Sequence, residues 1–208
     1  MLSRALDFSL YLITDRRALP SGRSLDDAVG AACAGGVGAV QLREKDLDTR
    51  ALYALACRLR EITAAHGVRL LINDRIDLAL AVAADGVHLG GRSLPLAVAR
   101  RLLGPDGLIG VSTHNPQEIH AAHQNGADFV TFGPVYATPS KAAFGPPQGL
   151  QALHAACAGA SLPVFALGGI TPERAGEVRA AGAQGLAAIR AILGAADPTC
   201  AARRFARE

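Results

Sequence analysis

The 208-residue chain contains no tryptophan, and aromatic residues make up only 4% of it. So few aromatic side chains argue against a stacking platform for single-stranded nucleic acid. Hydrophobic residues make up 50% and charged residues 19% of the chain, a composition that excludes a disordered protein. Alanine, valine, leucine and isoleucine must therefore fill the core, as they do around a buried parallel sheet.

The four cysteines are widely spaced and form no Cys-x-x-Cys pair. Each lies among small residues, so we expect reduced, buried side chains rather than a zinc site or a disulfide framework. The net charge is only +3, from 21 Lys and Arg residues against 18 Asp and Glu residues. The basic group Arg203, Arg204 and Arg207 is typical of a solvated helix face rather than of a nucleic-acid arm.

No apolar run approaches the roughly 18 residues that are needed to cross a bilayer. Residues 1–12 also lack the basic start of a signal peptide. We therefore expect a soluble, cytoplasmic protein that binds neither membranes nor nucleic acid. A homo-oligomer is compatible with this sequence, which leaves the number of subunits open.

Short apolar runs alternate along the chain with longer stretches whose apolar residues have helical spacing. The alternation predicts eight strand–helix units of roughly 26 residues each. The predicted strands cover 9–13, 37–43, 70–73, 86–89, 108–112, 129–133, 164–167 and 185–189. The predicted helices cover 25–34, 49–65, 75–84, 95–103, 116–125, 149–158, 172–181 and 198–207.

Repeated units of this kind form a parallel sheet with right-handed crossovers. The sheet is either open and doubly wound or closed into a (β/α)8 barrel. A count of eight units favours the barrel, although 208 residues is near the lower limit of about 200 for that fold. No Gly-x-Gly-x-x-Gly follows the first strand, which disfavours a dinucleotide-binding sheet. We predict one (β/α)8 barrel domain over residues 1–208.

Helix ends are marked in the sequence. Ser24, Asn115 and Thr171 precede predicted helices and are expected to cap them. A glycine follows an alanine-rich helix in four similar segments, where it can end the helix in the left-handed conformation. These segments are AGGVGAV (34–40), AADGVHL (83–89), QNGADFV (124–130) and AAGAQGL (180–186).

Polar residues follow the predicted strands at their carboxyl ends, where barrels of this class build active sites. Alternation along the second strand places Gln41, Arg43 and Lys45 on one side. Long cationic side chains there would reach the open mouth and meet an anion, unless the strand simply runs out into solvent. The third strand ends in Asn73 and Asp74. Asp74 could hold Mg²⁺ or cap the next helix, and the spacing alone favours the cap.

Later strands end in smaller polar groups. Ser112 follows the fifth strand and could contact a phosphate or make a turn hydrogen bond. The long loop over 132–149 brings the donors Thr138 and Lys141 close to the mouth, although its glycines and prolines are typical of any solvent loop. Gly168-Gly169-Ile170 follows the seventh strand, where bare backbone N–H groups commonly bind phosphate.

The six histidines form no cluster with zinc-ligand spacing. His120 and His123 lie three residues apart on one predicted helix, and we expect both to be solvated. His88 lies inside the fourth strand, which indicates a core residue with its hydrogen bonds satisfied.

Several segments in this order resemble the thiamine-phosphate synthase/TenI family over nearly the whole chain. They are YLITD (11–15), QLREK (41–45), LINDRIDLALAVAADGVHL (71–89), GVSTHN (110–115), GADFVTFGPVYATPSK (126–141) and ALGGI (166–170). The resemblance implies a (β/α)8 barrel enzyme that joins a pyrimidine diphosphate to a thiazole phosphate. The pyrimidine methylene would lose pyrophosphate in a dissociative step, and the thiazole nitrogen would capture the resulting cation.

The resemblance also implies roles for residues that match the family pattern. Arg43 and Lys141 would act in catalysis on the departing diphosphate, and Asp74 would hold Mg²⁺. The implied substrate contacts are Gln41, Lys45, Asn73, Ser112 and Thr138 together with Gly169, Ile189 and Arg190 around the thiazole phosphate. Cationic groups placed where negative charge develops suit such a reaction, and no covalent nucleophile is required.

Two positions depart from the synthase pattern. The synthases usually carry a second metal-binding acid shortly after GVHLG, and this chain has Ser93 instead. A neutral hydroxyl is a poor Mg²⁺ ligand, so we expect weakened metal binding. Arg190 stands where the synthases usually have serine, and its guanidinium would either add phosphate affinity or crowd the site.

The segment GRSLP (91–95) is similar to the TenI branch, which includes thiazole tautomerases. Those enzymes move a proton with a histidine where this chain has Pro134, which cannot do so. We predict a thiamine-phosphate synthase. The alternatives are a thiazole tautomerase with another proton-transfer group and a non-catalytic protein that binds thiazole phosphate or thiamine phosphate.

Overall fold

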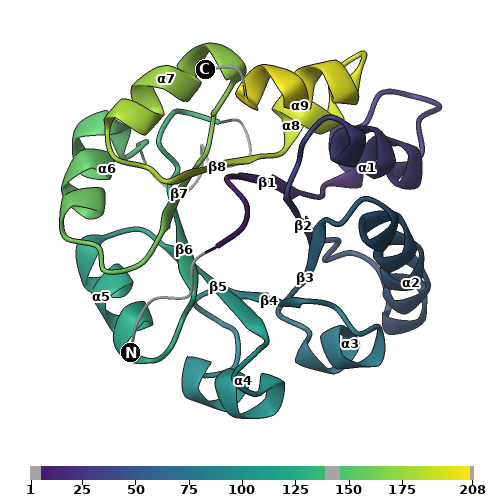
Figure 1. Ribbon diagram of the computed structural model, residues 1–208, viewed down its shortest axis with the longest axis horizontal. Coiled ribbons are helices and arrows are strands. Elements are labelled where there is room, and N and C mark those ends of the chain that lie inside the picture. Colours follow the sequence, from purple (N-terminus) through teal and green to yellow (C-terminus); the bar gives the residue numbers. More distant parts are fainter. Residues whose placement is uncertain (1–5, 139–145, 207–208) are drawn as a thin grey trace.

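The computed structural model describes residues 6–138 and 146–206. Eight parallel strands pair in chain order, and β8 pairs with β1 to close a barrel (Figure 1). This confirms the predicted (β/α)8 architecture and excludes the open sheet. The strands are β1 (Leu10–Ile13), β2 (Ala39–Leu42), β3 (Arg69–Asn73), β4 (Gly86–Leu89), β5 (Leu108–Thr113), β6 (Phe129–Phe132), β7 (Val164–Leu167) and β8 (Gly185–Ala188).

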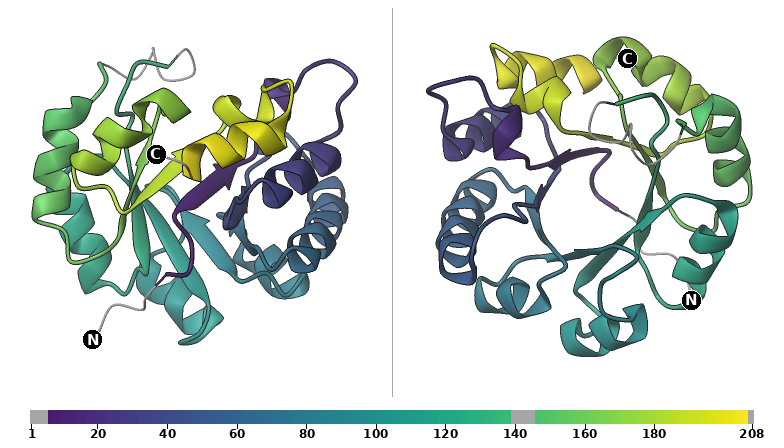
Figure 2. Two further views of the ribbon diagram at one scale, coloured as in Figure 1. Left: turned by 45° about the horizontal axis from the view of Figure 1, so that its top comes forward. Right: turned by 180° about the vertical axis from the view of Figure 1, so that it is seen from behind.

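Helices surround the barrel on its outside (Figure 2). They are α1 (Leu25–Ala34), α2 (Thr49–Ala65), α3 (Ile76–Ala81), α4 (Leu96–Leu103), α5 (Pro116–Gln124), α6 (Gly149–Ala158), α7 (Pro172–Ala180), α8 (Arg190–Leu193) and α9 (Pro198–Ala206). The short helix α8 and the 3-10 turn η1 (Arg16–Ala18) were not predicted. Helix α3 ends three residues earlier than expected, because the chain turns at Val82 and Ala83.

Two apolar cores lie on the two faces of the sheet. The larger core packs the outward strand residues, such as Leu12, Val40 and Ile72, against the helices. The smaller core fills the barrel interior and contains four aromatic rings in mutual contact, those of Phe8, Tyr11, Phe129 and Phe165. Every second strand residue faces inward, as the alternation of a β-strand requires.

Glycine on neighbouring strands makes room for those rings. A Cβ atom at Gly110 would lie 2.4 Å from Cζ of Phe129 and 2.6 Å from Nδ1 of His88. At Gly185 it would lie 2.2 Å from the ring of Phe165. Small and large residues therefore alternate inside the barrel, which keeps the interior packed although the chain has few aromatics.

At the amino ends of the strands, one residue ahead of each of β4, β6 and β8 clasps the preceding strand. Asp85 accepts a hydrogen bond from the backbone N–H of Leu70 at 2.8 Å, and Asp128 accepts one from Ile109 at 2.7 Å. The amide oxygen of Gln184 accepts from Val164 in the same way at 2.8 Å. In each pair the backbone N–H of the clasping residue also bonds to the partner's carbonyl. We call these three contacts the amino-end clasps.

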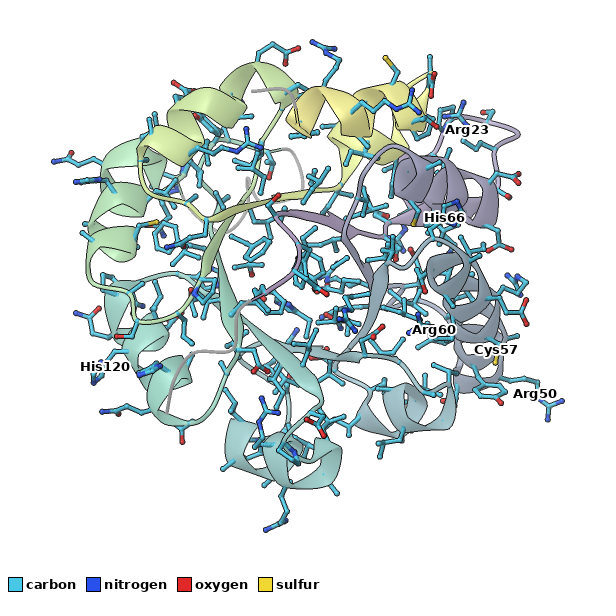
Figure 3. All side chains as sticks on the ribbon, viewed as in Figure 1. Arg23, Arg50, Cys57, Arg60, His66 and His120 are labelled. Atoms are coloured by element: carbon cyan, nitrogen blue, oxygen red, sulfur yellow. The ribbon has the colours of Figure 1, made fainter. Side chains whose placement is uncertain are left out.

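The cysteines form no disulfide, as predicted, but they are not all buried. Cys33 is buried, Cys57 and Cys157 are half-buried, and Cys200 is exposed on α9. His120 projects from the outer face of α5, away from the barrel (Figure 3). No helix within the described part of the chain is long and apolar enough to span a membrane.

Candidate active site

The predicted site residues that the structure describes lie in the carboxyl halves of the strands or just after them, so they lie at or below one rim of the barrel. Gln41 is in β2, Asn73 ends β3, and Ser112 is in β5. Gly169 follows β7, and Arg190 begins α8 directly after β8 and Ile189. Thr138 lies in the segment after β6 and is half-buried. Lys141 lies outside the described residues, so its predicted position is not tested.

Asp74 is the centre of a polar cluster on this rim. Its carboxylate accepts hydrogen bonds from the amide nitrogen of Asn73 at 2.7 Å and from the hydroxyl of Ser93. The ammonium group of Lys45 lies 3.8 Å from the same carboxylate. Asp74 adopts a left-handed backbone conformation, with φ at 62°, which Asp tolerates better than most residues. The alternative role as a helix cap is wrong, because α3 begins with no side-chain cap and Asp74 bonds elsewhere.

This cluster contains one carboxylate where a two-acid metal site would have two. No group of three or more His, Cys, Asp or Glu residues in the described ranges could hold a metal ion. Mg²⁺ commonly takes one or two carboxylates and completes its shell with water and substrate phosphates. The single carboxylate of Asp74 is compatible with such a partly hydrated ion, whereas Ser93 supplies no second negative charge.

Below the rim, a hydrogen-bonded chain crosses the barrel interior. The amide nitrogen of Gln41 donates to Tyr11 Oη at 2.9 Å, and Tyr11 Oη lies 3.3 Å from Nδ1 of His88. Nε2 of His88 lies 3.0 Å from the hydroxyl of Ser112 and 3.4 Å from that of Thr131. His88 is 2% exposed and Gln41 1%. The prediction that His88 is a core residue with satisfied hydrogen bonds is confirmed.

Burial controls the ionisation of this chain of groups. It lowers the pKa of His88 to about 3, because a buried imidazolium is poorly solvated; the charge of Asp74 opposes this shift and that of Arg43 adds to it. Burial also raises the pKa of Tyr11 well above its usual value, and the hydrogen bond from Gln41 opposes that rise only in part. Both groups are therefore neutral near pH 7.

Sequence analysis missed one buried carboxylate beside the rim. Glu44 is 5% exposed and accepts hydrogen bonds from the backbone N–H and the Nε of Arg16 in η1. Strand β2 has already ended at Leu42, so alternation no longer predicts which way Glu44 points. The only signal was its acidic charge between Arg43 and Lys45. The pair holds η1 against the segment after β2, while the side chain of Arg43 stays exposed.

The segments after β6 and β7 are tied together on the opposite side of the rim. A Cβ atom at Gly168, where φ is 100°, would lie 2.6 Å from Pro134, so only glycine fits. The guanidinium of Arg174 lies 4.2 Å from the ring centre of Tyr136 and donates to the carbonyl of Gly169 at 2.8 Å. The hydroxyl of Tyr136 donates to Glu177. Burial first, and then this bond, raises the pKa of Tyr136 to about 12.

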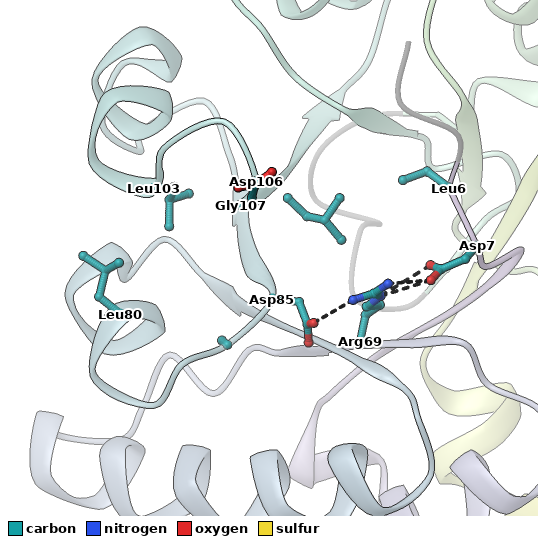
Figure 4. Close-up of a pocket in the computed structure, with 10 residues that line it drawn as sticks. Leu6, Asp7, Arg69, Leu80, Asp85, Leu103, Asp106 and Gly107 are labelled. Carbon is teal, nitrogen blue, oxygen red and sulfur yellow. Dashed lines mark hydrogen bonds and ion pairs between the residues drawn. The ribbon is translucent and has the colours of Figure 1, made fainter.

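Two surface cavities lie in different places. A cavity of about 520 Å³ adjoins the rim and is lined by Gly90 and Gly91, by Ser112–His114 and by α5. Another of about 470 Å³ lies at the opposite, amino end of the barrel (Figure 4). There Arg69 is held between Asp7 and Asp85, with hydrogen bonds of 2.6 Å and 3.1 Å. None of the predicted site residues that the structure describes lines this second cavity.

A closed eight-stranded barrel whose carboxyl rim gathers cations, amides and hydroxyls is typical of (β/α)8 proteins that handle phosphorylated small molecules. The family model described as thiamine monophosphate synthase matches residues 10–192. The chain belongs to this family, as the sequence segments predicted.

Known relatives agree over nearly the full chain. A protein from Geobacter sulfurreducens is 56% identical over 198 residues, which cover 95% of this chain and 92% of the relative. The thiamine-phosphate synthase of Moorella thermoacetica is 45% identical over 198 residues, covering 95% and 94%. The solved thiamine phosphate pyrophosphorylase of Pyrococcus furiosus superposes with a TM-score of 0.86 at 36% identity, covering 96% and 94%.

Proposed function

We propose that this protein is a thiamine-phosphate synthase. It joins a hydroxymethylpyrimidine diphosphate to a thiazole phosphate, giving thiamine phosphate and pyrophosphate. Family membership and the name of the 45% identical Moorella relative support this activity. The observation that carries the proposal is the polar cluster at the ends of β2 and β3, where Lys45 and Asn73 surround the single carboxylate of Asp74.

In the proposed reaction, the bond between the pyrimidine methylene carbon and the diphosphate oxygen breaks first. Its electron pair leaves with pyrophosphate, and the lone pair of the thiazole nitrogen then attacks the methylene cation. Arg43, Lys45 and Lys141 stabilise the negative charge that develops on the leaving group, which is where electrostatic catalysis is most effective. Gln41, Asn73 and Ser112 hold the pyrimidine diphosphate.

Mg²⁺ is the proposed cofactor, and Asp74 would hold it against the diphosphate. When bound, the ion would neutralise part of the leaving group's charge. The hydroxyl of Ser93 bonds to Asp74 instead of adding a carboxylate. The protein's own cations therefore take a larger share of the neutralisation.

The thiazole phosphate is proposed to bind on the opposite side of the rim. Gly169 offers a backbone N–H group in a left-handed turn, with φ at 68°. Ile189 packs against the interior core, and Arg190 is exposed just beyond it. Thr138 completes this end. The Arg190 guanidinium suits a bidentate contact with the phosphate.

The direct test is to incubate the purified protein with both substrates and Mg²⁺ and to measure thiamine phosphate and pyrophosphate. Equal amounts of the two products are expected. Lys141→Ala should abolish coupling, whereas Arg17→Ala, which changes a side chain that is 77% exposed, should leave it unchanged. Absence of product at every metal concentration would refute the synthase function.

A thiazole tautomerase is the second candidate, and one contact favours it. Nδ1 of His114 lies 2.7 Å from the carbonyl oxygen of Gly133, beside the Pro134 that replaces the TenI histidine. His114 could therefore move a proton at that place. NMR of thiazole tautomer conversion tests this function: conversion that His114→Gln abolishes would support it. A third outcome, tight calorimetric binding of thiamine phosphate without either turnover, would identify a non-catalytic binder.

A further inference from the structure

The interior chain of Gln41, Tyr11, His88 and Ser112 joins two residues that the proposed function places against the pyrimidine diphosphate. Tyr11 is fully buried, and Gln41 and His88 are nearly so. Water therefore cannot replace the protein groups as hydrogen-bond partners along this chain. Each hydrogen must point to a partner within it, because an unsatisfied buried donor is costly.

The direction of the bonds follows from the end at Gln41. Its amide nitrogen carries only donors, so Tyr11 Oη accepts at 2.9 Å. Tyr11 keeps its own proton, and the remaining hydrogen-bond partner of its oxygen in the described structure is Nδ1 of His88 at 3.3 Å. Tyr11 therefore donates, and Nδ1 of His88 accepts.

His88 is neutral because its side-chain partners are all uncharged hydroxyls, and because the charge of Asp74, which favours an imidazolium, is opposed by that of Arg43 and does not outweigh burial. A neutral imidazole whose Nδ1 accepts must carry its proton on Nε2. That proton points to the hydroxyl oxygen of Ser112 at 3.0 Å, and Thr131 shares it at 3.4 Å.

We infer that His88 is a positioning residue that fixes Ser112 as a hydrogen-bond donor to the anionic leaving group. The Ser112 oxygen accepts from His88, and no other bond to its side chain is present within residues 6–138 and 146–206. Its own hydrogen is left to point into the mouth. The reverse direction would make Ser112 donate inward and present only oxygen lone pairs to a polyanion. This inference rests on the proposed function for its role, but the direction of the bonds does not.

The first test is ¹⁵N NMR of the ligand-free protein with labelled histidine, which requires no catalysis. His88 should be a neutral imidazole with the proton on Nε2. Tyr11→Phe removes the hydroxyl that donates to Nδ1 and should shift His88 toward a mixture of tautomers. Tyr53→Phe is the matched control, since Tyr53 is 43% exposed on α2 and should leave the spectrum unchanged. A proton on Nδ1, or an imidazolium, in the unmodified protein would overturn the inference.

The second test compares two substitutions at His88. A glutamine amide nitrogen can stand near the position of Nε2 and still donate to Ser112, whereas asparagine is one carbon shorter and cannot reach it. His88→Gln should retain coupling within about tenfold, and His88→Asn should lose roughly tenfold more, the worth of one donor bond. Equal losses in two folded variants would overturn the positioning role. If the unmodified protein formed no thiamine phosphate, the synthase proposal would fail while the NMR result still decided the bond direction.

Discussion

At the amino ends of the strands, Asp85 and Asp128 each bond to a backbone N–H of the preceding strand and to arginine. At the carboxyl ends, the side chain of the exposed Arg43 makes no hydrogen bond or ion pair with the described residues, and Lys45 shares Asp74 with two neutral donors. Both ends carry similar residue types. Charges that are matched and half-buried hold strands together, whereas cations left in excess are available to a ligand.

The contrast between the two ends of the barrel is tested most directly at Asp128. Asp128→Ala removes the carboxylate that bonds to Arg100 and to the Ile109 N–H, at 2.6–2.7 Å. We expect a loss of about 3 kcal/mol in the free energy of unfolding, because a half-buried arginine keeps only backbone carbonyls as partners and a strand N–H loses its side-chain acceptor. Urea unfolding measures this. Glu173→Ala breaks an exposed pair with Arg204 and should change the stability far less, because solvent screens that pair. Equal losses would contradict the comparison.

Arg43→Ala tests the other end. The kcat for coupling should fall at least about 100-fold, since the proposed mechanism places this cation beside the developing charge. The urea midpoint should stay within error of the unmodified protein. Steady-state kinetics and unfolding are measured on the same preparation. A large loss of stability would mean that Arg43 holds the fold, as the amino-end arginines do.

Ser93→Asp tests metal binding at the carboxyl rim. A second carboxylate beside Asp74 should lower the half-saturating Mg²⁺ concentration about tenfold. Calorimetric titration with Mn²⁺ gives a readout that does not depend on turnover. Ser93→Ala, which removes the hydroxyl without adding charge, is the control and should not tighten metal binding. An unchanged titration for Ser93→Asp would count against the account of Ser93.

Arg174→Ala removes the stacking on Tyr136 and the bond to the Gly169 carbonyl. Because these contacts position the backbone after β7, the KM for thiazole phosphate should rise about fivefold with kcat changed less than twofold. Arg101→Ala, on the exposed face of α4, serves as the control. A fall in kcat with unchanged KM would place Arg174 elsewhere in the reaction.

The smallest expected effect concerns pH at the amino end. Burial tends to raise the pKa of Asp85, but bonds from the Leu70 N–H, Arg60 and Arg69 outweigh it and hold the pKa below its usual value. The stability that Asp85 contributes is therefore present above about pH 4 and is lost as pH falls through the lower, folded pKa. Urea midpoints from pH 6 to pH 3 should fall less steeply for Asp85→Asn.

The sequence predicted the barrel because each strand–helix unit carries its own periodicity and its own stop signals. Capping by Ser24 and Asn115 is confirmed. Thr171 makes no cap hydrogen bond. In AADGVHL the left-handed residue is Ala83 and not Gly86, which lies inside β4 where a Cβ would meet Leu108. The local sequence therefore does not distinguish a glycine that is required because two strands approach closely from a glycine that ends a helix.

The sequence predicted where the described candidate residues lie along the strands, but not how their side chains are connected. The ends of β2 and β3 were identified from their polar residues, and Lys45 does lie near Asp74. The bond between Ser93 and Asp74 joins residues 19 positions apart, and the bond between Tyr11 and His88 joins residues 77 apart. Such contacts depend on closure of the sheet, which no local pattern encodes. Short elements such as α8 were missed because four residues do not establish a period.

The amino-end clasps have a consequence for the order in which the barrel assembles. They join residues only 15, 19 and 20 positions apart. The pairs β3–β4, β5–β6 and β7–β8 therefore form three short strand–helix–strand modules, and closing each one loses little chain entropy. A circular permutant opened between β4 and β5 keeps every module whole and should refold at nearly the native rate. One opened between β3 and β4 separates Asp85 from Leu70 and should refold more slowly.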